Sequence, residues 1–195
     1  PIHHFGSVSL FIAKLWENGT WAWINNAGLD YSPCYGTART KLGAAVADSD
    51  GGLYVAGDFF QQNWDNSGNF IGYCSVTVSF GLSGVTADGP ALFLAKANTS
   101  TGSWEWAIGA NGDDSEYVQD LSVSGSTIRA HGNTRSSSLA FGNNTFTNGA
   151  DGFTGNSGVE GSAPFHVTVN SDGTWGEIIA PGVSSDSSTY SNSAS

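Results

Sequence analysis

The feature that most constrains how this chain can fold is a sequence unit that recurs along its 195 residues. A short apolar run, LFIAK at 10–14 in the first copy and LFLAK at 92–96 in the second, is followed by a turn and a Trp-x-Trp pair. A third and weaker copy starts at Phe141-Gly142 and has APFHVTV at 163–169 in the place of this run. In repeat proteins each unit buries its apolar surface against the next one. We therefore expect a row of similar structural units.

Each unit reads as short β-strands joined by tight turns. The apolar runs carry apolar residues on both faces, which is typical of interior strands covered on both sides. Asn18-Gly19 in the first copy and Asp172-Gly173 in the third supply the positive φ angles of tight hairpins. Trp21 and Trp23 lie two residues apart, so both are expected to point to one face of the returning strand. With 27 glycines and no long helical period, the chain is predicted to be all-β.

The first copy contains, in order, Phe-Gly, an apolar strand that ends in Ala-Lys, Gly-x-Trp-x-Trp and an LYVAG strand at 53–57. This arrangement resembles the secreted bacterial β-propeller repeat, and the resemblance extends to Pro181. The third copy departs from it, because FHV at 165–167 replaces the apolar run and Glu177 replaces the second Trp. The resemblance implies antiparallel, blade-like repeats and an extracellular or cell-envelope location. It implies no catalytic residues.

The number of units limits the architecture. A closed propeller needs about four to eight blades, so this chain cannot close a ring by itself. Three alternatives remain open: the chain is a piece of a longer protein, its sheets form an open array or a β-sandwich, or a strand from a neighbouring subunit completes them. The expected divisions are a first repeat at 1–79, a second at 80–140, a truncated third at 141–182 and a Ser-rich tail at 183–195.

A strand supplied by a neighbour predicts self-association. The N-terminal segment is apolar and strand-forming, and the candidates for a donated strand are Val8, Leu10, Phe11 and Ile12. Head-to-tail donation does not close on itself, so it builds a homopolymeric filament. The alternative, in which residues 1–15 pair within their own chain, stays open.

Charge and composition narrow the partners and the compartment. Six Lys and Arg face seventeen Asp and Glu, a formal charge of −11, which argues against binding nucleic acid or an anionic membrane. No apolar run is long enough for membrane insertion. Few lysines, many Ser, Thr, Asn and Gly, and two cysteines indicate a secreted, extracellular or cell-surface protein.

Cys34 and Cys74 lie in two insertions that the second copy lacks. We predict a disulfide that staples these insertions and closes a loop of about 40 residues, which would stabilise the fold by roughly 3–4 kcal/mol. Two free thiols are the alternative.

Further residues are candidates for glycan contacts. Asn-x-Ser/Thr acceptors for N-glycosylation occur at Asn18, Asn98 and Asn143. Trp16 and Trp64 lie outside the repeated Trp pairs and are therefore the better candidates for stacking on a sugar ring.

No catalytic site is evident, and no cofactor is expected. The four histidines have no spaced partner, and no nucleophile motif is present. Candidate Ca²⁺ ligands on turns, which are equally typical of residues that satisfy their own backbone, are Asp48, Asp50, Asp113 and Asp114. The sequence therefore predicts a non-catalytic extracellular structural protein that forms a fibre or pilus-like filament. The alternatives are a carbohydrate-binding or adhesive module and, third, a secreted hydrolase.

Overall fold

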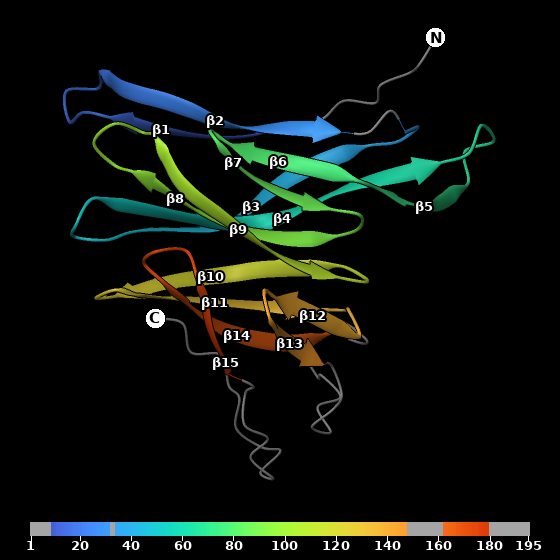
Figure 1. Ribbon diagram of the computed structural model, residues 1–195. Coiled ribbons are helices and arrows are strands. Elements are labelled where there is room, and N and C mark those ends of the chain that lie inside the picture. The colour runs from blue at the N-terminus through green and yellow to red at the C-terminus, as the bar shows by residue number, and fades with distance from the viewer. Residues whose placement is uncertain (1–8, 32–33, 148–161, 180–195) are drawn as a thin grey trace.

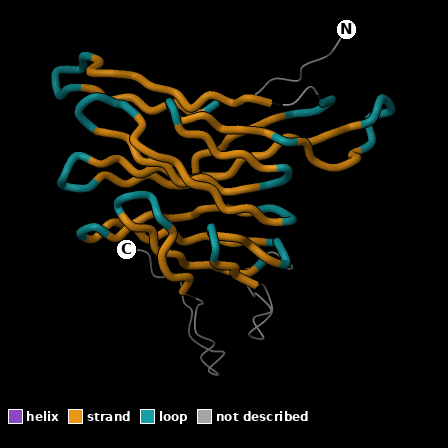
Figure 2. Tube along the Cα trace, viewed as in Figure 1, coloured by secondary structure: helices purple, strands orange, loops and turns teal. Residues whose placement is uncertain are grey.

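Three antiparallel β-sheets stack face to face in the computed structural model (Figures 1 and 2). The structure describes residues 9–31, 34–147 and 162–179, and every regular element within these ranges is a strand. The sheets do not close into a ring. The prediction of an all-β fold with an open arrangement of antiparallel sheets is therefore confirmed.

Each sheet has its own strand order. The N-terminal sheet runs β1 (Leu10–Leu15), β2 (Trp21–Tyr31), β6 (Val76–Phe80), β7 (Ser83–Ala87). The middle sheet runs β13 (Asn144–Thr147), β12 (Ser138–Phe141), β9 (Trp104–Gly112), β8 (Ala91–Asn98), β4 (Gly52–Trp64), β3 (Ala38–Ala47), and β5 (Phe70–Cys74) pairs with the far end of β4. The C-terminal sheet runs β10 (Glu116–Ser124), β11 (Thr127–Thr134), β14 (Ala163–Asn170), β15 (Trp175–Ile179).

The repeat is distributed over neighbouring sheets. Every sheet contains one hairpin that carries the apolar run and the Trp-bearing strand of a repeat, which is β1–β2, β8–β9 or β14–β15. After the first and the second of these hairpins the chain crosses to the next sheet, adds β3–β4 or β10–β11 there, and returns with β6–β7 or β12–β13. Each full repeat thus contributes two hairpins to one sheet and a third hairpin to the following sheet. The chain therefore links each sheet to the next.

Two hydrophobic cores fill the spaces between the sheets. In β8, Phe93 faces the N-terminal sheet and Leu94 faces the C-terminal sheet, and both are buried. The run at 92–96 is therefore an interior strand, as predicted. The same prediction is wrong for 10–14, because β1 belongs to the outermost sheet: Ile12 is buried toward the middle sheet, but Phe11 is exposed.

The Trp-x-Trp pairs point to opposite faces, contrary to the prediction from their spacing. Trp106 lies opposite Lys96 and Trp104 lies opposite Ala97, so the intervening residue is the extra residue of a β-bulge. The Trp104 indole N–H donates to the carbonyl of Asn26 in the N-terminal sheet over 3.1 Å. The bulge therefore allows one pair of tryptophans to contact both neighbouring sheets.

These tryptophan contacts recur at each interface. Trp106 donates from Nε1 to the carbonyl of Ser171 over 3.1 Å, and Trp23 donates to that of Thr99 over 3.1 Å. Trp175 repeats the bond of Trp104 by donating to the carbonyl of Gly109 over 3.2 Å. Each indole joins its own sheet to a backbone carbonyl of a neighbouring sheet, which fixes how the layers are placed.

The tryptophans lie over the hairpin turns of the following sheet. A Cβ built on Gly102 would come within 2.6 Å of the Trp23 ring, and one on Gly173 within 2.8 Å of the Trp106 ring. The equivalent Gly19 has nothing within 4 Å. The predicted hairpins are confirmed, but only their glycines have positive φ; Asn18 does not, because the loop is a type I turn followed by a left-handed glycine.

We expect Gly102→Ala to destabilise the protein by roughly 1–3 kcal/mol more than Gly19→Ala, because overpacking against the Trp23 ring adds to the shared strain. The two glycines have nearly the same φ, +76° and +80°, so the cost of positive φ is matched. Urea unfolding of both variants measures the difference. Equal losses of stability would show that the tryptophan contact contributes nothing.

Candidate interaction surface

The N-terminal sheet exposes on its outer side a residue that the other two sheets bury. Phe11 is 62% exposed, whereas its counterparts in the second and third copies, Phe93 and Phe165, are 1% and 0% exposed. Both counterparts pack against the preceding sheet of the stack. Phe11 thus has the position of an interface residue but no sheet to contact among the described residues.

Neighbouring side chains of the N-terminal sheet are likewise exposed where their counterparts in the middle sheet are packed. Trp21 is 64% exposed, whereas its counterpart Trp104 packs edge-on against Phe80 of the preceding sheet, with ring centroids 4.9 Å apart. Ile24 is 68% exposed, whereas Ala107 packs against the core. We refer to this surface as the outer face, which is formed by Phe11, Leu15, Trp21 and Ile24.

The edge of the N-terminal sheet beside the outer face is also incomplete. In the middle sheet β4 pairs with β8, and in the C-terminal sheet β11 pairs with β14. The equivalent strand β1 pairs only with β2 within the described part of the chain. A counterpart of the β3–β4 and β10–β11 hairpins is therefore absent from this edge among the described residues.

The C-terminal sheet presents a polar surface at the opposite end of the stack. His166 is the counterpart of Leu94, which is buried in the core between the middle and C-terminal sheets. Glu177 is the counterpart of Trp106, which contacts the C-terminal sheet. His131 lies across from His166, with ring centroids 4.2 Å apart, and burial together with this neighbour lowers the pKa of His166. The two ends of the stack therefore differ in chemistry.

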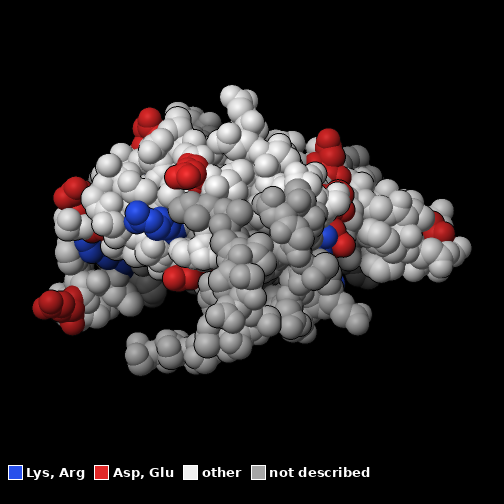
Figure 3. Space-filling view, turned by 90° about the horizontal axis from the view of Figure 1, so that it is seen from below, with Lys and Arg blue, Asp and Glu red and all other residues white. Residues whose placement is uncertain are grey.

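The molecule viewed from the side of the C-terminal sheet shows Asp and Glu side chains at separate points around its outline (Figure 3). Lys and Arg side chains in this view are few and do not form a continuous patch. This distribution gives an anionic polymer no basic surface on the visible described atoms of this side.

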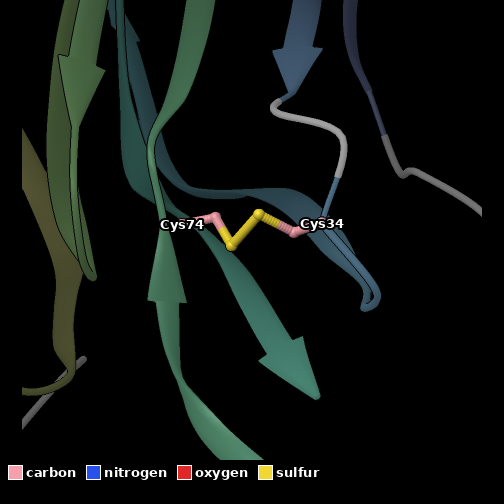
Figure 4. Close-up of a disulfide and its surroundings, with 2 residues drawn as sticks. All are labelled: Cys34 and Cys74. Carbon is pink, nitrogen blue, oxygen red and sulfur yellow. A yellow bond between two sulfur atoms is a disulfide. The ribbon is translucent and has the colours of Figure 1, made fainter. Parts of the chain in front are cut away.

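The predicted disulfide is confirmed. Cys34, which precedes β3, is bonded to Cys74 at the end of β5, with Cα atoms 6.7 Å apart (Figure 4). The bond ties the β4–β5 hairpin to the segment at 35–37, which runs along the other side of the end of β4.

A second group of aromatic side chains lies on this stapled hairpin. The ring centroids of Trp64 and Phe70 are 5.6 Å apart, and Tyr73 lies 5.2 Å from Phe70 and 6.0 Å from Phe60. The Arg39 guanidinium lies 4.5 Å from the centre of the Phe60 ring. We refer to this row of four rings as the aromatic stripe. Only its tryptophan was a candidate from the sequence. The alternation of Phe60 and Trp64 along β4 was a signal for Phe60, whereas Phe70 and Tyr73 come from the paired strand β5.

The other predicted residues lie apart from one another. Trp16 is exposed in the β1–β2 turn, on the opposite side of the molecule from the β4–β5 hairpin (Figure 1), and the Lys14 ammonium lies 4.9 Å from its ring centre. The donor-strand candidates Leu10 and Ile12 are buried in β1. Val8 lies outside the described residues.

The glycosylation acceptors are at element ends. Asn18 is in the β1–β2 turn, Asn98 ends β8 and Asn143 is exposed in the β12–β13 turn. Asn18 and Asn98 already accept hydrogen bonds from their own turns, and glycosylation at all three stays a prediction.

The candidate calcium ligands serve their own turns. Asp48 accepts hydrogen bonds from the backbone of Asp50 and Gly52 and from the Tyr54 hydroxyl. Asp113 accepts from the backbone and hydroxyl of Ser137, and Asp114 from the backbone of Ser115. No cluster of His, Cys, Asp or Glu suited to a metal ion occurs among the residues described.

A scan against protein-family models finds no match for this chain, and neither does a search of curated proteins. The resemblance to the secreted propeller repeat therefore rests on the residues quoted for it. The described ranges contain no helix with the length and hydropathy to cross a membrane.

Glu116 is a buried carboxyl that no sequence pattern singled out. Thr134 and Ser136 both donate hydrogen bonds to its Oε1, while its Oε2 has no partner among the described residues. Burial raises the pKa of Glu116 to about 8, and the charges of Asp114 and Asp113 act in the same direction. The carboxyl is therefore protonated at neutral pH.

We expect the free energy of unfolding to fall as the pH rises from about 4.5, the ordinary pKa of this carboxyl, to about 8. The folded state holds the Glu116 proton more tightly than the unfolded state does. The stabilisation is therefore complete below the pKa of the unfolded state, and it is lost as the pH rises through the pKa of the folded state. Urea unfolding from pH 4 to 9 measures the trend. Glu116→Gln should flatten it; an unchanged slope would contradict the assignment.

Proposed function

We propose that this chain is a non-catalytic structural module that joins another β-sheet of the same kind through the outer face of its N-terminal sheet. The observation that carries the proposal is the contrast between exposed Phe11 and its buried counterparts Phe93 and Phe165. Two interfaces inside the molecule show what this position does when a preceding sheet is present. The outer face is therefore the unpaired half of a sheet-to-sheet interface.

According to this proposal only one end of the stack, the N-terminal sheet, associates with a partner; we call such assembly one-ended. Repeat arrays remain soluble when their terminal unit has a polar outer surface, and the surface that carries His131, His166 and Glu177 has this character. A filament built by donating β1 would require β1 to leave its pairing with β2. Addition of a sheet to the outer face requires no such loss, so we favour addition over donation.

Several observations support a structural role. Two small cavities, one lined by core residues between the middle and C-terminal sheets and one beside Glu116, each measure about 10 Å³, the space of a single water molecule. Neither is large enough for a substrate. The disulfide is compatible with an oxidising compartment, and we infer a secreted or cell-surface location.

We expect the purified chain to form a discrete dimer through its outer face, because a second copy presents the same apolar surface and the two surfaces can cover each other. Phe11→Asp combined with Ile24→Asp should give a monomer at concentrations where the wild type is dimeric. Leu82→Asp is the matched control, since Leu82 is fully exposed in the β6–β7 turn. Sedimentation velocity measures all three.

Two results would contradict the proposal. A wild-type chain that stays monomeric at hundreds of micromolar would show that the outer face does not bind a sheet. Open-ended filaments would show that assembly is not one-ended.

Carbohydrate binding at the aromatic stripe is the second candidate function. Rows of half-exposed rings held by a rigid backbone can stack on sugar rings, and polar neighbours then provide orientation. Trp64 is held in place because Gly36 packs directly beneath it; a Cβ on Gly36 would come within 2.9 Å of the Trp64 ring. Phe70, which lies between Trp64 and Tyr73 in the row, is nearly half exposed. The disulfide prevents the hairpin from folding away.

We expect Trp64→Ala and Phe70→Ala each to weaken binding of any recognised glycan by about tenfold or more, because each removes one stacking surface. Trp16→Ala is the control, since this tryptophan lies at the other end of the sheets. A glycan array followed by calorimetry on the selected glycan measures the effect. Retention of binding by Trp64→Ala would exclude the stripe.

A further inference from the structure

We propose that the free edge of β1 is a binding site for a β-hairpin of the β3–β4 type, and that a glycine placed opposite Phe11 is the residue that specifies this hairpin. The inference rests on the proposed function, because it names the element that would arrive with the partner sheet. The proposed hairpin would bind the backbone edge of β1, whereas the proposed partner sheet would cover the side chains of the outer face.

The two complete edges in the molecule supply the geometry. In the middle sheet Gly57 of β4 lies directly opposite Phe93 of β8, and in the C-terminal sheet Gly132 of β11 lies directly opposite Phe165 of β14. Phe11 holds the same place in β1. The same cross-strand pair of glycine and phenylalanine thus occurs wherever this edge is filled.

A side chain at the glycine would meet two groups. The nearer is a backbone carbonyl of the hairpin itself, that of Lys41 for Gly57 and that of Tyr117 for Gly132, and the other is the phenylalanine ring of the neighbouring strand. A Cβ on Gly57 would come within 2.9 Å of the ring atom Cε1 of Phe93. A Cβ on Gly132 would come within 2.5 Å of Cζ of Phe165. An aromatic ring that covers a glycine in the neighbouring strand recovers the packing that the glycine itself lacks. A hairpin with a larger residue at this point would displace the ring.

The ring and the edge act together in the complete sheets. Because Phe93 and Phe165 lie over the incoming strand and also face the preceding sheet, one ring contacts two partner elements. Among the described residues neither contact is made at β1, which accounts for the exposure of Phe11. An edge strand with free backbone groups and an exposed aromatic ring is a template for strand addition.

The experiment supplies the hairpin to the intact chain. Residues 115–135, which contain β10 and β11 and no cysteine, are fused before Pro1 through a flexible linker, so that the local concentration of the hairpin is in the millimolar range. Hydrogen exchange of the amides of residues 10–15 and burial of the Trp21 indole are measured. We expect the fused hairpin to slow exchange in β1 by about tenfold or more relative to the unfused chain.

The glycine is tested by a double-mutant cycle. Gly132→Val in the fused hairpin alone should abolish the protection. A valine there also approaches the carbonyl of Tyr117 within the hairpin, so the same change is made together with Phe11→Ala. If the glycine acts through the phenylalanine, its substitution costs clearly less protection when Phe11 is already absent.

The outcomes separate this inference from the proposed function. Equal protection by the glycine and valine hairpins, or an equal loss with and without Phe11, would overturn the glycine requirement. No protection from a fused hairpin in a chain that still dimerises through its outer face would overturn the edge site and leave the proposed function standing. No protection together with a monomeric unfused chain would overturn both.

Discussion

The contact of a tryptophan with the turn glycine of the next sheet is the interaction on which the stack depends. Trp23 lies over Gly102 and Trp106 lies over Gly173, and each indole also donates a hydrogen bond to a backbone carbonyl of the neighbouring layer. Aromatic burial supplies the energy of such a contact, and the directional hydrogen bond fixes its geometry. Because one bulge turns the two tryptophans of a pair to opposite faces, a single hairpin holds the layer before it and the layer after it.

This arrangement makes each layer depend on its neighbours. A layer contributes half of each interface it forms, and the middle and C-terminal sheets each combine a hairpin of one repeat with strands of the next. The consequence is visible at the ends. The outermost sheet of such a stack must either expose apolar interface positions or replace them with polar residues. The N-terminal sheet exposes them at Phe11, and the C-terminal sheet replaces them at His166.

The sequence carried enough information for the fold class, the hairpins and the disulfide, because turn glycines, apolar alternation and two unmatched cysteines are local signals. It misled on Trp21 and Trp23, since a bulge breaks the period of two that the prediction assumed. It also misled on 10–14: burial of that run depends on whether a further sheet is present, which no residue in the run encodes. Glu116 gave no signal, because its burial arises from contacts between distant strands.

The outer face alone does not provide enough energy for tight association, which is why the edge of β1 matters. Four apolar side chains, each stabilising by roughly 1.5–3 kcal/mol when fully buried, give about 6–12 kcal/mol. Loss of translational and rotational freedom on association costs an estimated 4–15 kcal/mol. The two terms are comparable, so a sheet that covers only this face is held weakly. A hairpin that also pairs with β1 adds backbone hydrogen bonds, each worth about 1 kcal/mol net, and it covers the second side of Phe11. Within the molecule both contacts are always made together, at Phe93 and at Phe165. Tight addition to the N-terminal sheet therefore requires a partner that fills the face and the edge at the same time, whereas a second copy that covers only the outer face forms a weak dimer.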